Sequence, residues 1–170
     1  ESRKEKGLLL DRSTTENVML SALSRVSRYG HIHRRAERRI AAKTLEQVTV
    51  RSGGRSSRLP VRLLSGGNQQ KVLFGRTLLR EPRVVIADEP TRGVDVASKR
   101  AIYDLLVGLA DTGVGVLLIS SEIEEILGLS QRVIVMARGR VVGEFVGELL
   151  TEANILAAAF RAPEPGDAVA

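Results

Sequence analysis

A serine followed by two glycines opens one of the helices that the sequence predicts, and this arrangement can bind phosphate. Ser65, Gly66 and Gly67 combine a hydroxyl with two amides that carry no side-chain bulk. The first amides of a helix have no partner within it, and the helix dipole favours an anion there. For this tripeptide alone, an ordinary Ser-capped helix after a glycine turn is the favoured interpretation. The following Asn68-Gln69-Gln70-Lys71 and a pair of carboxylates farther on favour phosphate binding instead.

The two adjacent carboxylates, Asp88 and Glu89, follow an apolar run at residues 84–87 and precede Pro90. Open α/β sheets bind their ligands at the carboxyl ends of the strands. Asp88 is suited to hold Mg²⁺ through water, because Mg²⁺ prefers oxygen ligands and keeps part of its hydration shell. Glu89 would then orient or deprotonate an attacking water. A strand that simply ends in polar residues is the alternative, and the nearby glycine loop makes it the less favoured one.

The elements that position these residues are predicted from capping signals and apolar periodicity. Ser13 and Glu16 fit a capping box, and the apolar stripe that follows it consists of Val18, Leu20, Leu23 and Val26, with Gly30 as the breaker. Further helices are predicted at residues 34–48, 66–80, 96–110, 122–127 and 148–160, strands buried on both faces at 84–87 and 116–119, an exposed loop at 51–58, and a hairpin of 132–136 with 141–145. We therefore expect a helical subdomain at residues 1–82, part of an α/β core at 83–161 and a disordered tail at 162–170.

Composition restricts the class of protein. At 170 residues, the chain is long enough for a hydrophobic core. The absence of cysteine excludes a disulfide framework and a thiolate metal site. His31 and His33 are too few for most metal clusters and are expected to be solvated. No apolar run approaches the roughly 20 residues that span a bilayer, and no secretory signal is visible. The chain begins at Glu1 rather than Met, so we expect a fragment or a trimmed chain.

Much of the net charge of +6 lies in one basic segment, which contains Arg25, Arg28, Arg34, Arg35, Arg38 and Arg39. A solvated helix face is the favoured interpretation. A surface that faces anionic lipid headgroups or an acidic partner loop is the alternative. Nucleic acid is the least favoured partner, because the segment has one tyrosine and no platform on which bases could stack.

Two motifs taken together resemble those of ATP-binding cassette (ABC) ATPases. The segment Leu64-Ser65-Gly66-Gly67-Asn68-Gln69-Gln70-Lys71 resembles the ABC signature, and Asp88-Glu89-Pro90-Thr91-Arg92-Gly93-Val94-Asp95 resembles the Walker B segment and D-loop. Both resemble the second ATPase half of the tandem cassettes in bacterial ribose-, galactose- and xylose-type importers. Glu1-Ser2-Arg3-Lys4 is similar to the Glu-Asp-Arg-Lys segment of those halves, with Ser2 in place of Asp. The similarity extends to about Phe160.

The resemblance implies a partial P-loop NTPase core with an α-helical signature subdomain, and it implies ATP and Mg²⁺ as cofactors. In this family, ATP lies between two halves arranged head to tail. The residues implied to bind nucleotide are Leu64, Ser65, Gly66, Gly67, Asn68, Gln69, Asp95 and Ser121. The signature residues would serve ATP held by the partner half. Asp88 as metal ligand, Glu89 as catalytic base and Ser121 would serve the site of this half.

Two departures from the general ABC pattern affect activity, and the first of them resembles the second halves of the sugar importers. Ser121 stands where the switch histidine is usual, and a hydroxyl can donate a hydrogen bond to phosphate but carries no positive charge. This predicts a weaker ATP site on this half, unless Ser121 is only a polar residue at a strand end. The sequence also contains no Gly-x-x-x-x-Gly-Lys-Ser/Thr (Walker A) loop, so we expect the isolated chain not to hydrolyse ATP.

The resemblance predicts an ATP-binding fragment of an importer that couples Mg-ATP hydrolysis to monosaccharide uptake. The implied partners are the other nucleotide-binding half, membrane permease subunits and, indirectly, a periplasmic or lipid-anchored sugar-binding protein, with no nucleic acid. The implied location is the cytoplasmic face of the plasma membrane, as a peripheral protein. A catalytically inactive remnant and a non-transport ABC ATPase acting on DNA or ribosomes remain as alternatives. The sugar itself cannot be identified from this chain.

Overall fold

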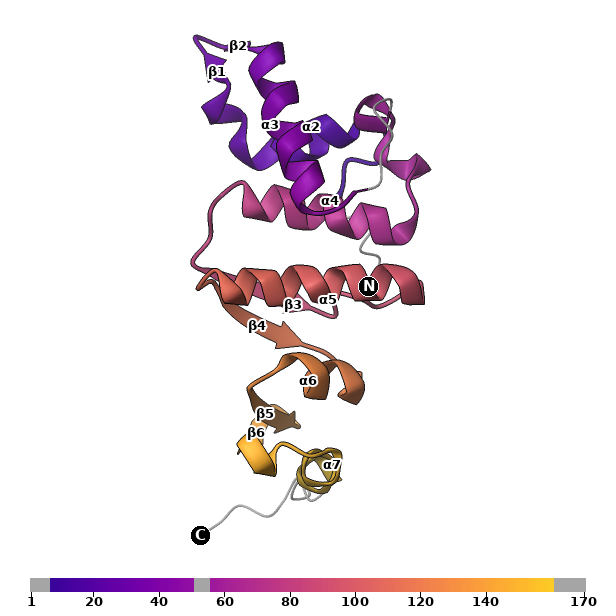
Figure 1. The fold of residues 1–170 in the computed structure, drawn as a ribbon, viewed down its shortest axis with the longest axis vertical. Coiled ribbons are helices and arrows are strands. Elements are labelled where there is room, and N and C mark those ends of the chain that lie inside the picture. Colours follow the sequence, from indigo (N-terminus) through magenta and orange to yellow (C-terminus); the bar gives the residue numbers. More distant parts are fainter. Residues whose placement is uncertain (1–6, 51–55, 161–170) are drawn as a thin grey trace. The chain divides into compact units, whose positions relative to one another are not determined.

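The computed structural model describes residues 7–50 and 56–160. The Glu1-Ser2-Arg3-Lys4 segment, most of the predicted loop at 51–58 and the predicted tail at 162–170 lie outside the described residues. The chain divides into two units, Glu1–Leu117 and Leu118–Ala170, coloured along the sequence in Figure 1. The boundary that the sequence predicts at residue 82 lies within the first unit and stays a prediction.

Helices predominate in the first unit, and one hairpin and two helices make up most of the second. The first unit contains α2 (Thr14–Met19), η1 (Leu20–Arg25), β1 (Ser27–Arg28), β2 (His31–Ile32), α3 (Arg34–Gln47), η2 (Ser56–Arg58), η3 (Val61–Leu63), α4 (Gly66–Leu78), β3 (Val84–Asp88) and α5 (Val96–Asp111). Strand β4 (Gly115–Ile119) contains the boundary, and the second unit continues with α6 (Ile123–Leu129), β5 (Arg132–Ala137), β6 (Arg140–Val146), η4 (Gly147–Leu149) and α7 (Glu152–Phe160).

The predicted capping box starts α2. The Ser13 hydroxyl accepts a hydrogen bond from the Glu16 amide at 3.2 Å, and Glu16 Oε2 accepts one from the Ser13 amide at 2.9 Å. The apolar stripe that was predicted to follow is partly wrong, because the helix tightens into the 3₁₀ helix η1 after Met19. That change of period leaves Leu20 exposed and buries Met19 and Ala22.

We expect the capping box to lose strength in acid. Hydrogen bonds from the Ser13 backbone, and then from its side chain, hold the pKa of Glu16 below its usual 4.5. A lowered folded-state pKa contributes stability above pH 4.5 that is lost as the pH falls through the folded value. Ser13→Ala should lower the unfolding free energy by about 1 kcal/mol at neutral pH. Urea unfolding at several pH values checks this, and a difference that does not shrink in acid would contradict the assignment.

A short hairpin replaces the simple helix end that Gly30 was predicted to make. Strands β1 and β2 pair antiparallel, with Arg28 opposite His31. The two central residues of the turn, Tyr29 and Gly30, have φ of 50° and 78°. Positive φ at both positions is the requirement of a tight two-residue hairpin turn. Gly30 therefore reverses the chain rather than only ending a helix.

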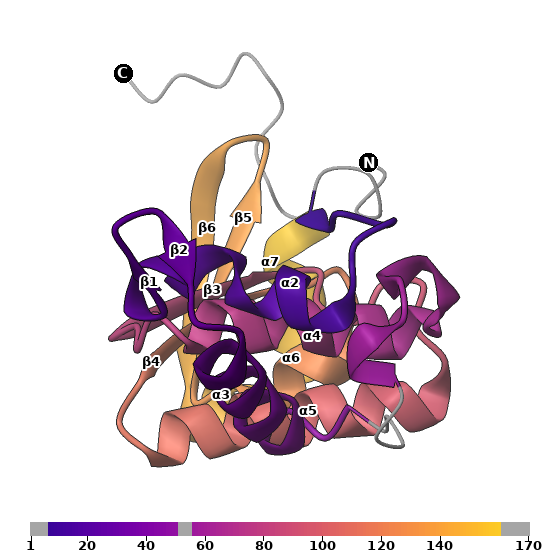
Figure 2. The same ribbon diagram turned by 90° about the horizontal axis from the view of Figure 1, so that it is seen from above.

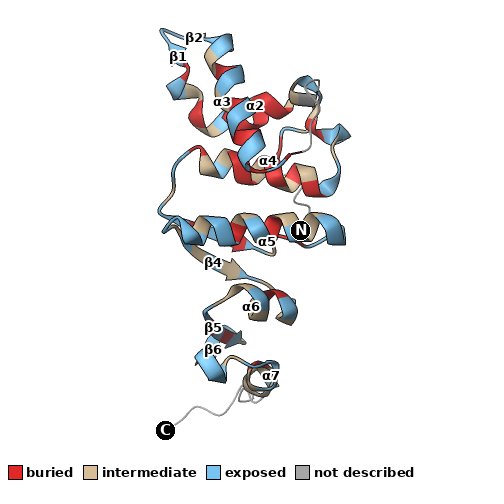
Figure 3. Cartoon of the chain, viewed as in Figure 1, coloured by how far each residue is buried: buried red, intermediate tan, exposed pale blue. Residues whose placement is uncertain are grey.

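Helices α2, α3 and α4 form the packed core of the first unit, and Figure 3 shows their buried faces. The prediction of α3 is confirmed within one residue. Helix α4 begins at Gly66 with Ser65 as its N-cap, as predicted, but ends at Leu78, two residues earlier than predicted. Its core positions include Val72 and Phe74.

An asparagine–arginine network joins α4 to the start of the chain, and sequence reasoning missed it. Asn17 is fully buried, and its side chain bonds the backbone of Leu9 in both directions at 2.9 Å. Arg76 of α4 donates to the carbonyl and the side-chain oxygen of Asn17 at 2.8 and 3.0 Å, and to the Gly7 carbonyl at 2.6 Å. Burial lowers the pKa of Arg76. The network compensates for that burial by satisfying the guanidinium.

Strands β3 and β4 form a two-stranded sheet, but the prediction that both are buried on both faces is wrong for the described chain. Side chains alternate across a strand, so Val85 and Ala87 are buried while Val84 and Ile86 are 62% and 66% exposed. Leu117 of β4 is exposed as well. The described residues cover one face of β3 only.

The predicted hairpin of the second unit is confirmed. Strands β5 and β6 pair antiparallel around a turn in which Arg138 and Gly139 have φ of 50° and 76°. Val133 and Val135 of β5 pack with Ile155 of α7 in a small core. Helix α7 begins at Glu152, four residues later than predicted, because η4 takes up the preceding residues.

Candidate functional site

The predicted phosphate-binding loop lies at the exposed start of α4. Ser65 accepts hydrogen bonds from the amide and side-chain nitrogen of Asn68, at 3.4 and 3.1 Å, through its hydroxyl. The Gln69 amide donates to the Ser65 carbonyl at 2.9 Å. Gly66 is exposed and Gly67 is buried. Because the first amides of a helix have no partner within it, the exposed Gly66 amide is the one best placed to bind an anion.

Gln69 holds the loop in place from inside. Its side chain is buried, and its Nε2 donates to the carbonyls of Val61 and Leu64 at 3.2 and 3.1 Å. Leu64 therefore contributes its backbone to the support of the loop. These contacts account for Gln69 without a ligand, and its role toward nucleotide stays a prediction, as does that of Asn68.

Gly67 packs against the start of α5, a contact that sequence reasoning missed. A Cβ built at Gly67 would lie 2.3 Å from both Cβ and Oγ of Ser98, whereas one built at Gly66 would meet the Gly93 carbonyl at an ordinary 3.6 Å. The absence of a side chain at Gly67 is therefore required by the neighbouring helix. The sequence shows only that two glycines are adjacent, because the partner lies about 30 residues downstream.

Asp95 caps α5 at this contact. Its Oδ1 accepts a hydrogen bond from the Ser98 amide at 3.0 Å. This interaction with Ser98 lowers the pKa of the exposed Asp95 carboxyl. Ser98 thus bonds Asp95 through its backbone and contacts Gly67 through its side chain. The structure brings together the glycine loop and Asp95, which lie far apart in sequence.

Asp88 and Glu89 lie at the end of β3, as predicted. Asp88 is exposed and Glu89 is partly buried. Glu89 has φ of 46°, an uncommon value for a residue with a side chain, and the next two residues, Pro90 and Thr91, are buried. Such conformations cost about 1–3 kcal/mol and concentrate at functional sites. Tyr29, Thr49, Glu81 and Arg138 have similar φ values, so this conformation is compatible with a functional role for Glu89 but does not identify one.

The donor set at Asp88 fits a Mg²⁺ ion that is held mainly by water and phosphate. Among the described residues, no group of three His, Cys, Asp or Glu side chains could enclose a metal. Mg²⁺ commonly takes one or two carboxylates and fills its remaining positions with water and substrate phosphates. One exposed carboxylate at a strand end meets that requirement.

Ser121 belongs to the second unit, where it precedes α6 and is exposed. Its neighbour Ser120 donates to Glu125 Oε2 at 2.6 Å and accepts from the Glu122 amide at 3.0 Å. These bonds shape the turn between β4 and α6 around Ser121. Its role toward phosphate stays a prediction.

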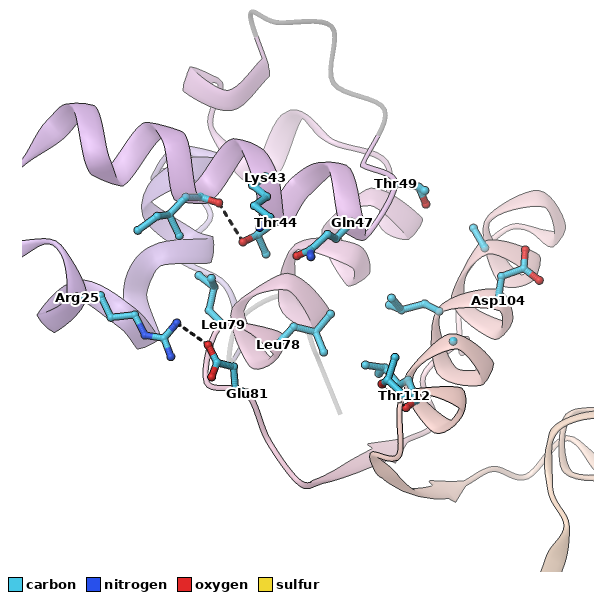
Figure 4. A pocket seen from close by; sticks show the side chains of 15 residues that line it. Arg25, Lys43, Thr44, Gln47, Thr49, Leu78, Leu79, Glu81, Asp104 and Thr112 are labelled. Atoms are coloured by element: carbon cyan, nitrogen blue, oxygen red, sulfur yellow. Dashed lines mark hydrogen bonds and ion pairs between the residues drawn. The ribbon is translucent and has the colours of Figure 1, made fainter.

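A cavity of about 790 Å³ lies elsewhere in the first unit, between α3, the end of α4 and α5 (Figure 4). Aliphatic side chains, among them Leu78, Leu105 and Leu109, form much of its lining, and an Arg25–Glu81 ion pair at 3.1 Å lies at its edge. None of the predicted site residues lines it. The cavity is therefore distinct from the glycine loop and from the carboxylates.

A family model for ABC transporters matches residues 3–92, which include the glycine loop, Asp88 and Glu89. This match covers more than half of the chain. The chain belongs to the ABC transporter family.

Curated relatives of this ABC transporter chain are sugar importer components. It is 49% identical over 170 residues to the ribose import ATP-binding protein RbsA 2 of Rubrobacter xylanophilus, covering 100% of the chain and 32% of that relative. It is 41% identical over 167 residues to the xylose import ATP-binding protein XylG of Pseudomonas syringae pv. tomato, covering 98% and 31%. The resemblance to the carbohydrate importer group is confirmed. The chain spans about a third of the length of these relatives.

Solved structures confirm the fold class of this ABC transporter chain. A bacterial ABC transporter cassette solved as a dimer aligns with a TM-score of 0.69 and 27% identity, over 84% of this chain and 60% of that one. A dimeric cassette bound to ADP and phosphate aligns with a TM-score of 0.68 and 25% identity, over the same shares. The predicted α/β P-loop core with a helical subdomain agrees with both. No helix in the described ranges is long and apolar enough to cross a membrane.

Proposed function

We propose that the complete protein is the ATP-binding component of an importer that couples Mg-ATP hydrolysis to monosaccharide uptake. The observation that carries the proposal is the start of α4, where Ser65 caps the helix and Ser65 and Gly66 are exposed, so that a phosphate could reach the first amides. Relatives whose printed names state ribose or xylose import support the sugar class. Their names describe ATP-binding proteins, which supports ATP as the nucleotide.

The residues of this chain divide between two ATP sites. Ser65 and the glycine amides would bind the γ-phosphate of ATP held by the other nucleotide-binding half. Asp88 would hold Mg²⁺, and Glu89 would orient or deprotonate the attacking water, at the site of this half. Asp95 and Ser98 join the loop to α5, so movement of the D-loop would be transmitted to the glycine loop.

Closure and reopening of the two halves would drive transport. ATP shifts a conformational equilibrium only through its different affinity for the two states, and a site completed across the interface supplies that difference. The partners would be the second half, the permease subunits and, indirectly, an extracytoplasmic sugar-binding protein. The protein would act peripherally at the cytoplasmic face of the membrane, with residues 1–82 as the signature subdomain and 83–161 as part of the α/β core.

Ser65→Arg in the complete protein should abolish ATP-driven closure at the opposite half while ATP binding to this half's own Walker A persists. The arginine would occupy the space above the Gly66 and Gly67 amides. Uptake of labelled ribose or xylose by cells that depend on the protein, together with nucleotide crosslinking in each half, tests this. Ser24→Arg is the matched control, because Ser24 is exposed on η1 and the charge change is the same.

Normal uptake by the Ser65→Arg protein would overturn the proposed role of the loop. Equal loss of crosslinking in both halves would indicate that Ser65 acts only as the cap of α4 and not across the interface.

The 170-residue chain by itself should show no ATP turnover above background. Its sequence has no Walker A loop, whose amides and lysine would hold the β- and γ-phosphates. Steady-state phosphate release measures this. Turnover by the purified chain that disappears in Glu89→Gln would contradict the expectation.

A further inference from the structure

The net charge of the chain is concentrated in one segment. Residues 25–43 contain seven Arg and Lys side chains and one carboxylate, so their net charge of +6 equals that of the whole chain. All seven basic residues are exposed. The single carboxylate, Glu37, is buried and paired with Arg34 at 2.9 Å. The rest of the chain is therefore neutral overall, and the net positive charge of the protein comes from this segment.

Four of these basic residues lie, with Tyr29, on the hairpin and on the solvent-facing side of α3. We call this the hairpin–α3 surface, and it consists of Arg28, Tyr29, Arg35, Arg39 and Lys43. Its helical positions lie on the side of α3 opposite the buried residues Ala41, Thr44 and Leu45, whereas Arg34 and Arg38 lie nearer the buried side, beside Glu37. The hairpin leads directly into α3, and both views show it beside the first turn of that helix (Figures 1 and 2).

An aromatic residue stands at the tip of this surface in a conformation that does not suit it. Tyr29 is 88% exposed, and its φ of 50° is unfavourable for a bulky side chain. Asparagine is the residue that such a hairpin turn prefers. The Arg28 guanidinium lies 5.3 Å from the centre of the Tyr29 ring. The stability of the hairpin does not explain why a tyrosine occupies this exposed and strained position beside Arg28.

We propose that the hairpin–α3 surface binds the anionic headgroups of a phospholipid bilayer directly, in addition to any contact with permease subunits. Clustered Arg and Lys side chains are attracted to anionic leaflets, and a tyrosine ring suits the headgroup level because one end is apolar and the other polar. The basic side chains of this surface are spread over an exposed hairpin and an exposed face of α3. Such a spread matches a fluid layer of negative charge better than it matches one acidic protein loop.

Vesicle cosedimentation of the full 170-residue chain tests the proposal without any permease. Vesicles of phosphatidylcholine mixed with phosphatidylglycerol should bind the chain, and phosphatidylcholine alone should not. Each basic residue near the surface contributes about fivefold in partitioning, so Arg35→Ala/Arg39→Ala should weaken binding about 25-fold. Raising the salt from about 0.1 to 1 M should release the chain, because the screening length falls from about 10 to 3 Å.

The matched control is Arg83→Ala/Arg140→Ala, which removes the same charge from exposed positions outside the surface. Circular dichroism confirms that each variant remains folded. If both double variants lose vesicle binding equally, binding depends on the net charge alone, and the role of the hairpin–α3 surface is overturned. Equal binding to both kinds of vesicle, or binding to neither, would overturn the lipid proposal and favour an acidic protein partner.

Two substitutions at Tyr29 separate a lipid role from a structural one. Tyr29→Asn should stabilise the hairpin yet weaken binding several-fold, a combination that a purely structural Tyr would not produce. The chain contains no tryptophan, so Tyr29→Trp introduces a single fluorescent reporter. Its emission should shift to the blue with anionic vesicles only. Emission that stays unchanged in the vesicle-bound chain would place the tip in water and overturn its contact with the bilayer.

Discussion

Glu89→Gln in the complete protein should slow ATP hydrolysis at this half's site by about 10² to 10⁴-fold while ATP binding is preserved. General-base assistance is commonly worth a factor of that size. The amide keeps the shape of the carboxylate but cannot accept the proton. Gln is no better suited than Glu to the φ of 46° at this position, so the substitution changes basicity and leaves the backbone strain in place.

Single-turnover hydrolysis with nucleotide bound at this half provides the measurement. Glu148→Gln is the control, because Glu148 is exposed on η4 and the charge change is the same. A normal single-turnover rate in Glu89→Gln would exclude Glu89 as the base and would assign water positioning to another group. A loss of ATP binding instead of rate would indicate that Glu89 supports the site structurally.

Gly67→Ala should lower the unfolding free energy by about 1–3 kcal/mol, which is the usual cost of forcing an extra methyl into a packed contact. The new Cβ would lie 2.3 Å from Cβ and Oγ of Ser98, so α4 and α5 must separate. Gly66→Ala is the matched control. Its Cβ meets only an ordinary contact at 3.6 Å, and replacing glycine in a helix gains up to about 1 kcal/mol.

Urea unfolding of both single variants and of Gly67→Ala/Ser98→Gly tests the packing directly. Removal of the Ser98 side chain should make the alanine less harmful than it is in the parent background, giving a coupling energy between the two positions. If Gly66→Ala and Gly67→Ala destabilise equally, or if the two sites do not couple, the contact with α5 is not what requires Gly67. Phosphate access would then be the remaining explanation for both glycines.

Local chemistry made several elements predictable. Ser13 with Glu16 and Ser65 before its glycines both start helices because their hydroxyls accept hydrogen bonds from first-turn amides. Gly139 and the apolar runs on either side of it predict the second hairpin. The conformation of a tight turn depends on the residues of the turn itself, so this signal is also local. The Tyr29-Gly30 turn was missed because an aromatic residue is not expected at positive φ.

Burial was harder to predict, because it depends on what lies on the far side of each element. The apolar run that ends at Asp88 indicates two covered faces, yet the described residues cover only one. Asn17 and Arg76 look like ordinary polar residues in sequence. Their burial and pairing follow from the approach of α4 to the start of the chain, which no local pattern encodes.

The sequence by itself indicated the family, through the resemblance of two motifs to the ABC signature and Walker B segments, and it named candidate site residues whose roles stay predictions. Only the tertiary structure decided how those residues are held. It showed that Gly67 faces Ser98, that Gln69 points inward, that Glu89 is strained and that Arg and Lys side chains share a surface with an exposed tyrosine. The physical reason is distance along the chain: capping and turn chemistry act over three or four residues, whereas packing joins segments tens of residues apart.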